Sequence, residues 1–228
     1  MLGVAINALA VIVGSLLGFL LHKGISEKIN NAIMIGVGLC VAYIGIDGLT
    51  GGVNPLVAVL AIIPAAVIGT SLDFDGALIR FGEKVTSKFS HGSGSKAAEG
   101  FVTASLLFCI GAMAVVGSIS AGLTGDNSIL LTKSVLDFIS STMLSAAFGL
   151  GVMLSVIPLT IYQGGIALFA SFLSPVLTDS IIGALTCVGS ILILALGLNI
   201  LNISKIKIAN LLPAIIFAPF AQLLVDLI

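Results

Sequence analysis

A few polar side chains interrupt long apolar runs in this sequence, and they are the residues that could do chemistry. Asn7 lies one turn into the first apolar run, and Ser15 and Ser118 each follow a glycine near the middle of a run. Polar groups are costly inside a lipid bilayer, so those that occur there often line a path for an ion or a polar solute. Each also has a structural interpretation, because an asparagine can bond a neighbouring helix and a serine can bond its own helix backbone.

Two charged residues lie close together further along the chain. Asp137 follows Lys133 by four residues, so the two can meet on one helical face as an exposed ion pair worth roughly a few tenths of a kcal/mol. Asp126, in a Gly-Asp-Asn-Ser stretch, can cap a turn. If these groups act on a solute instead, Asp126, Lys133 and Asp137 would form a polar vestibule on the outer side of the membrane.

Hydroxyl groups are densest in the run that contains Asp137: Ser140, Ser141, Thr142 and Ser145. Hydroxyl oxygens can bind alkali cations or polar solutes, and hydroxyl protons can bond anions. We therefore expect a permeation path here, with Ser120 on the preceding run as a further member. A face of small residues that packs helices together is the alternative. Tyr162 and Gln163 bring a phenol and an amide to the next run, and the amide must find partners in lipid.

The composition shows why these polar groups stand out. Of 228 residues, 58% are hydrophobic and only 8% are charged, whereas soluble domains carry about 25% charged residues. Long apolar runs with 27 glycines fit closely packed membrane helices and do not fit a β-barrel, whose strands alternate. The net charge of −1 gives no electrostatic reason to expect a nucleic-acid partner. The lipid bilayer is the expected environment.

The sequence carries no catalytic or cofactor signature. It contains neither a P-loop nor a His-Glu-x-x-His motif, and its two histidines, His22 and His91, fall at a helix end and in a polar loop. The three cysteines have no paired spacing. We therefore expect no enzyme, no cofactor and no metal site, and an ATP-driven pump would need a partner chain.

The elements that position the polar groups are apolar segments of membrane-spanning length. About 20 apolar residues cross the hydrocarbon as a helix, which predicts eight spans: 3–22, 30–49, 54–72, 101–123, 134–156, 158–174, 181–201 and 209–227. The whole chain, 1–228, would be a single transmembrane domain. Its polar segment 73–99 is expected to be cytoplasmic, with a short amphipathic helix at its start and linker composition after it.

The basic residues decide whether the fifth and sixth segments are two spans, joined near Ile157 and Pro158, or one long helix. Cytoplasmic loops collect Lys and Arg. With eight spans, eight of the nine Lys and Arg residues fall on one side and only Lys133 falls on the other. Merging the two segments weakens this split to six against three. Eight spans are favoured, and both termini would then lie outside the cytoplasm.

The chain also contains a weak internal repeat. At an offset of 103 residues, 13–15 (Val-Gly-Ser) aligns with 116–118 (Val-Gly-Ser), and Pro55 aligns with Pro158. The first three spans, 3–72, would match the next three, 101–174, in the opposite membrane orientation, and the two helices in 181–227 would be an addition. This is the inverted repeat of many secondary transporters, which have broken helices near the membrane midplane.

Two further expectations follow from the repeat. Gly14 and Gly117 occupy matching positions, so we expect a bend or break at each, with Ser15 and Ser118 facing a central cavity. A weaker match of 60–65 with 211–216 leaves open a second pairing, in which spans one to three match spans six to eight. That pairing would also be inverted.

Several stretches of the chain resemble one known family. The opening MLGVAINALAVIVGSLLG, the later segments 36–40, 109–117, 122–126 and 133–137, and Tyr162-Gln163-Gly164 resemble the YdfK/YqgA-like family of bacterial inner-membrane proteins of unknown function. The resemblance covers nearly the whole chain. It implies a location in the bacterial plasma membrane and supplies no activity.

The leading prediction is a secondary transporter or channel-like permease for a small ion or small polar solute, with its path between the first, fourth, fifth and sixth spans. The predicted path residues are Asn7, Gly14, Ser15, Gly117, Ser118, Ser120, Asp137, Ser140, Ser141, Tyr162 and Gln163, with Asp126 and Lys133 in the outer vestibule. The alternative is a membrane scaffold or an accessory subunit of a larger complex. The many small residues on the spans also suit a homodimer.

Overall fold

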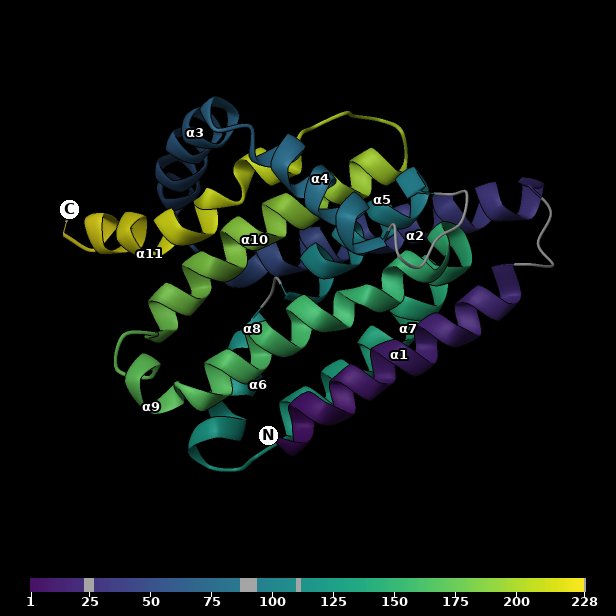
Figure 1. Cartoon of the computed structure of the whole chain (residues 1–228). Helices are drawn as coiled ribbons and strands as arrows, with labels where there is room; N and C mark the ends of the chain where they lie inside the picture. The colour runs from purple at the N-terminus through teal and green to yellow at the C-terminus, as the bar shows by residue number, and fades with distance from the viewer. Residues whose placement is uncertain (23–26, 87–93, 110–111, 228) are drawn as a thin grey trace.

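In the computed structural model, which describes residues 1–22, 27–86, 94–109 and 112–227, every regular element is a helix. The α-helices are α1 (Leu2–His22), α2 (Glu27–Asp47), α3 (Pro55–Ser71), α4 (Phe74–Thr86), α5 (Gly94–Cys109), α6 (Ala112–Leu123), α7 (Ser128–Phe148), α8 (Val156–Leu168), α9 (Ala170–Leu173), α10 (Asp179–Ile200) and α11 (Pro213–Val225). The 3-10 helices are η1 (Gly48–Gly51), η2 (Gly149–Ser155) and η3 (Ile208–Leu211). Figure 1 shows that the long helices α1, α8 and α10 lie along a common direction.

Helices of membrane-spanning length account for most of the described chain. Five helical segments are long and apolar enough to cross a membrane, and the number rises to seven if each of two bent helix pairs is one span. Large apolar side chains cover the outer surface; Leu20 is 68% exposed and Phe172 is 79% exposed. An apolar surface of this extent fits lipid better than water. The predicted all-helical fold with several membrane-length helices is confirmed.

The segment Ser128–Leu168, one of the five, is folded back on itself. Asp137 and Gln163 are 26 residues apart, about 39 Å of straight helix, yet both bond to the side chain of Asn7. The reversal follows Gly149, whose φ of 80° ends α7, because only glycine adopts this backbone conformation readily. α8 begins at Val156, close to the junction predicted near Ile157 and Pro158. The preceding helix was expected to reach 156 but ends at Phe148, and η2 makes the turn.

The predicted span 101–123 is bent, but not at the predicted residue. α5 and α6 meet at an angle of 59° between Cys109 and Ala112, whereas α6 continues through Gly117 and α1 continues through Gly14. Neither helix is broken at these two glycines, so the predicted helix breaks there are wrong. Both glycines serve close packing instead: a methyl group on Gly14 would lie 2.5 Å from the carbonyl oxygen of Phe138 on α7.

α1 and α7 pack along their whole length in the same direction. Gly3, near the start of α1, faces Leu130 near the start of α7, and Gly18, near the end of α1, faces Ala146 near the end of α7. Glycines at the contact let the two backbones approach closely. Polar side chains on the facing sides of α1 and α7 are therefore forced into contact with each other.

Two further helix pairs are antiparallel. Gly38 on α2 faces Leu201 just after α10, whereas Gly45 faces Leu194, so residue numbers rise along one helix as they fall along the other. α3 packs against α11, and Gly69 at the end of α3 meets Asn210, which precedes α11. The six helices of these three pairs, together with α5, α6 and α8, surround the buried core.

α4 is the predicted short amphipathic helix, and it begins at Phe74 as expected. The ring centroid of Phe81 lies 6.1 Å from that of Phe101 on α5, and Phe81 is 55% exposed. Of the predicted linker, residues 87–93 lie outside the described residues. α5 already begins at Gly94, so 94–99 is helix rather than linker.

Candidate functional site

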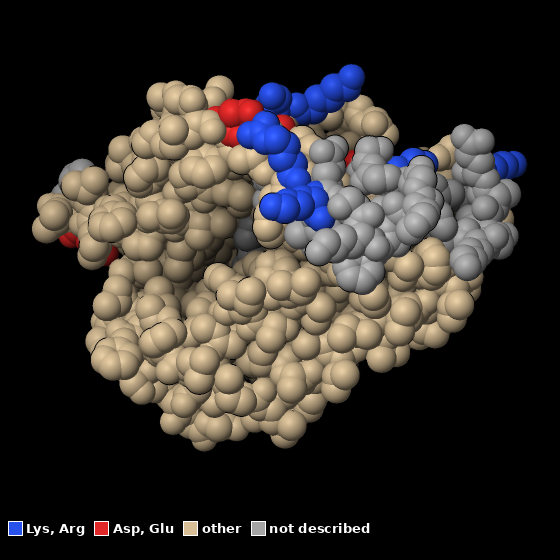
Figure 2. All heavy atoms as spheres, viewed as in Figure 1, with Lys and Arg blue, Asp and Glu red and all other residues tan. Residues whose placement is uncertain are grey.

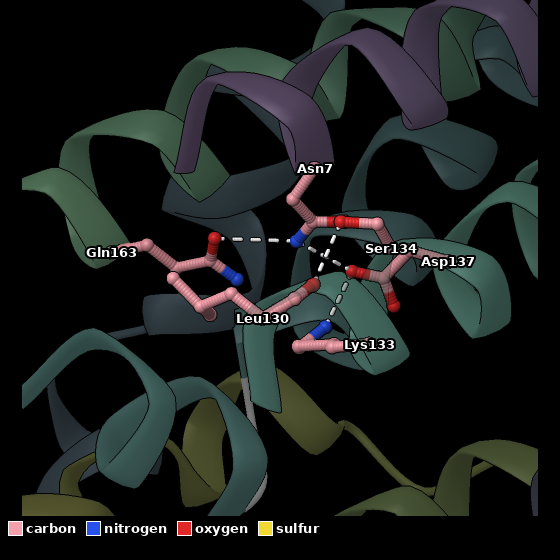
Figure 3. A network of polar contacts seen from close by, with 6 residues as sticks. All are labelled: Asn7, Leu130, Lys133, Ser134, Asp137 and Gln163. Carbon is pink, nitrogen blue, oxygen red and sulfur yellow. Dashed lines mark hydrogen bonds and ion pairs between the residues drawn. The ribbon is translucent and has the colours of Figure 1, made fainter. Parts of the chain in front are cut away.

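Side chains from three helices converge in a buried polar network, shown in Figure 3. Asn7 on α1 donates from Nδ2 to Asp137 Oδ2 on α7 at 2.9 Å and to Gln163 Oε1 on α8 at 3.2 Å. Lys133, one turn before Asp137, donates from Nζ to the same Oδ2. Asn7 and Gln163 have no exposed surface, and Lys133 and Asp137 are each 6% exposed. The network is thus shielded from its surroundings.

The ion pair at the centre of the network was expected on the surface, and that prediction is wrong. α7 begins at Ser128 rather than 134, so Lys133 lies within the helix and shares a buried face with Asp137, against which α1 packs. From the other side, Phe108 at the end of α5 lies under Lys133, with Nζ 5.9 Å from the ring centroid. A buried ion pair costs desolvation of both charges, so its presence in an apolar bundle needs a reason.

Asp126 does not join this pair, contrary to the predicted outer vestibule. It lies in the exposed loop before α7, where Oδ1 accepts a hydrogen bond from the Ser128 backbone N–H at 2.9 Å. Bonds from this N–H and from the Ser128 hydroxyl lower the pKa of the Asp126 carboxyl below its ordinary value. Asp126 is thus a turn-capping residue, which was the structural interpretation of its sequence context.

A thin apolar layer closes the network on one side. It is formed by residues from α1, α6, α7 and α8: Val4, Ala121, Leu130 and Ala167. One helical turn further into the bundle, on the same helix faces, lie polar residues: Asn7, Ser118, Ser134 and Gln163. We call these four residues, with Lys133 and Asp137, the polar layer. Beyond it the main core resumes with Val11 and Leu159, one turn from Asn7 and Gln163.

The polar layer has unused hydrogen-bonding capacity. Among the described residues, Asn7 Oδ1, Gln163 Nε2 and Ser118 Oγ are buried without a partner, as is Ser15 Oγ about two helical turns beyond Asn7 on α1. Leaving a buried polar group unpaired costs about 1–3 kcal/mol, and native proteins leave few such groups. Asn7 and Gln163 are bonded to each other. The unpaired acceptor, Asn7 Oδ1, and the unpaired donor, Gln163 Nε2, therefore belong to neighbouring side chains.

The predicted hydroxyl cluster on α7 mostly bonds the backbone. Ser141 and Thr142 donate to the Phe138 carbonyl at 3.0 and 2.8 Å, and Ser145 donates to the Ser15 carbonyl on α1 at 2.7 Å. Ser140 is half-buried. These contacts are typical of helix packing, and they favour the alternative interpretation of this cluster.

The remaining predicted path residues lie around the polar layer. Ser120, on α6, and Tyr162, beside Gln163 on α8, are half-buried. Gly117 packs against α7, where an added methyl group would lie 3.0 Å from Leu130 Cδ2. The structure thus brings Asn7, Ser118, Asp137 and Gln163 together and uses the glycines to hold their helices close.

Two adjoining cavities of about 340 and 480 Å³ lie at the other end of α5. Glu99 lines both, Thr103 lines the smaller one and Lys96 lines the larger one. α5 therefore runs from these cavities at Glu99 to the ion pair at Phe108. This region is not apparent from the sequence, because the residues that line the smaller cavity come from α4, α5, α10 and the chain before α11, which are distant in sequence. Among the described residues, no cluster of His, Cys, Asp and Glu has the make-up of a metal site.

A bundle of apolar helices around a buried charge pair defines this chain as a helical membrane protein with a polar interior site. It belongs to the family described as "Protein of unknown function (DUF554)", whose model matches residues 2–223. It is 35% identical to the uncharacterized membrane protein YdfK of Bacillus subtilis, over 96% of this chain and 94% of that protein. It is 34% identical to the uncharacterized protein YqgA of Escherichia coli, over 95% and 94% of the two chains. No solved structure matches it. The family expected from the sequence is thus confirmed.

Proposed function

We propose that this protein is a secondary transporter or channel-like permease for a small ion or small polar solute, and that the polar layer is its binding site. The observation that carries the proposal is the Lys133–Asp137 pair, buried in an apolar bundle beside side chains with unpaired polar atoms. Ionisable residues inside a membrane bundle are expensive and mark solute or ion pathways by default. A packing role alone would not require free donors and acceptors.

The bent helix pair supports this proposal. The axes of α5 and α6 differ in direction by 59°, and Phe108 near the end of α5 contacts Lys133. Discontinuous helices that meet at a binding site are a common feature of secondary transporters. The two cavities at Glu99 would be the cytoplasmic vestibule, and the apolar layer of Val4 and its three neighbours would be the outer seal.

Helix directions support eight crossings as part of the proposal. Counting α7 and α8 separately and each bent pair as one crossing gives eight. In that order α1 and α7 cross in the same direction, whereas α2 with α10, and α3 with α11, cross in opposite directions, in agreement with the observed packing. Seven crossings would make α2 and α10 parallel.

The same helix directions support an inverted repeat in which spans one to three match spans six to eight. α2 packs antiparallel to α10, and α3 packs antiparallel to α11. A short 3-10 helix precedes both α3 and α11. An axis in the membrane plane that exchanges α2 with α10 and α3 with α11 would relate spans one to three to spans six to eight. We therefore propose this pairing instead of the match between spans one to three and spans four to six, which the offset of 103 residues suggested.

Surface charge supports the proposed orientation. In Figure 2 the visible Lys and Arg side chains gather at the end of the molecule where α4 lies, and the lower half of this face shows none. Because cytoplasmic segments collect basic residues, this end would face the cytoplasm of a bacterium, and both termini would lie outside. The protein would reside in the plasma membrane.

Flux through proteoliposomes tests the proposal. The purified full chain is reconstituted and assayed with a panel of alkali cations, anions and small amino acids, and we expect flux above that of empty liposomes for at least one of them. Gln163→Leu, which removes the free donor, should lower this flux while the folded protein is retained. Absence of flux and of solute-dependent thermal stabilisation across the panel would reject the transporter and favour a scaffold or accessory subunit.

A further inference from the structure

We infer that the solute bound in the polar layer is a small zwitterion, with one ammonium group and one carboxylate, as in a small amino acid. This inference rests on the proposed function and narrows its substrate class. It follows from three properties of the polar layer: its balance of charge, the kinds of polar atom left unpaired, and its tight packing.

The charge balance disfavours solutes of a single charge. Lys133 and Asp137 neutralise each other in a site with almost no exposed surface. A lone cation that paired with Asp137 would displace Lys133 and leave a buried ammonium without a counterion, and a lone anion on Lys133 would strand Asp137 in the same way. An uncompensated buried charge is strongly destabilising. A zwitterion exchanges the internal ion pair for two new ones, with its ammonium on Asp137 and its carboxylate on Lys133.

The unpaired atoms indicate the same class. Asn7 Oδ1 is an acceptor and Gln163 Nε2 is a donor, and neither has a partner among the described residues. A solute must therefore offer both a donor and an acceptor to satisfy them. An ammonium group can donate to Asn7 as well as to Asp137, and a carboxylate can accept from Gln163 as well as from Lys133. The free hydroxyl of Ser118 can serve either end.

Tight packing around the polar layer favours a solute of a few heavy atoms. Asn7 and Gln163 have no exposed surface, and the large neighbours Phe108, Leu130 and Leu159 have none either. The network is closed over itself, so the solute replaces the internal ion pair when the helices part and does not fill a preformed cavity. A long side chain would have to displace the apolar layers on both sides.

Four small probes of different charge separate the alternatives: glycine, acetamide, acetate and methylammonium. Binding to the purified full-length protein in detergent is measured by thermal unfolding over a concentration series. We expect glycine to bind at least about tenfold more tightly than each of the others, a difference of about 1.4 kcal/mol. If acetamide binds as tightly as glycine, the site does not recognise the charges of the solute. If acetate or methylammonium binds more tightly than glycine, the site prefers a solute with a single charge. Failure of glycine to bind would also overturn the inference.

Variants locate the binding. The double replacement Lys133→Met with Asp137→Leu removes both charges and keeps apolar volume, so it should abolish glycine binding in a protein that still unfolds cooperatively. Asp126→Asn, in the exposed loop, should leave glycine binding unchanged. Glycine binding that persists in the double variant places the site elsewhere. Flux of a simple ion without glycine binding would reject the zwitterion and keep the transporter, whereas no flux of any solute would reject the proposed function as well.

Discussion

Removing one charge of the buried ion pair should destabilise the protein far more than removing both. In Lys133→Met the Asp137 carboxylate stays buried and loses the one cation that pairs with it among the described residues. Breaking a buried pair in this way costs about 3–5 kcal/mol. We expect a value near 3 kcal/mol, because Asp137 keeps the hydrogen bond from Asn7 at 2.9 Å.

The double variant, Lys133→Met with Asp137→Leu, leaves no buried charge. Its remaining cost is the lost bond between Asn7 and Asp137, about 0.5–1.5 kcal/mol, and Asn7 still donates to Gln163. The free energy of unfolding is measured for both variants by reversible SDS titration in mixed micelles, followed by circular dichroism. If the single variant is as stable as the wild type, or the double variant is as unstable as the single one, the ion pair is not buried as described.

Three smaller perturbations test the packing and the path. Gly18→Ala should cost about 1–3 kcal/mol, because the added methyl group meets the backbone of α7; Gly36→Ala on α2, where the methyl group enters open space, is the control and should not destabilise the helix. Gly149→Ala should cost about 1 kcal/mol in the same unfolding assay, because its φ of 80° strains any side chain, and an unchanged stability would contradict the sharp turn after α7. Ser15→Ala with Ser118→Ala removes two hydroxyls that have no partner among the described residues, so stability should hold while flux falls; unchanged flux would place the path elsewhere.

The site could be predicted in part, since buried polar residues stand out in an apolar sequence. Asn7, Ser118, Asp137 and Gln163 were chosen because polar groups in long apolar runs are rare. Lys133 was assigned to the surface because the helix was expected to start after it. The spacing of Leu130, Lys133, Ser134 and Asp137 on one helical face was the available signal, and it becomes visible only if α7 starts at Ser128.

The helix breaks were predicted less well, for a physical reason. A glycine in a membrane helix permits either a bend or a close contact, and the sequence does not distinguish these. Gly14 makes a close contact with α7, and Gly149 makes the turn. Whether a glycine allows a bend or a close contact depends on whether a neighbouring helix lies against it.

The sequence by itself determined that this chain crosses lipid as helices and which polar residues would be expensive there, because both follow from the transfer of side chains between water and hydrocarbon. Only the tertiary structure decided that Lys133 and Asp137 are buried together with Asn7 and Gln163. These contacts join residues up to 156 positions apart, and they form because α1 and α7 pack in parallel and α8 folds back against them.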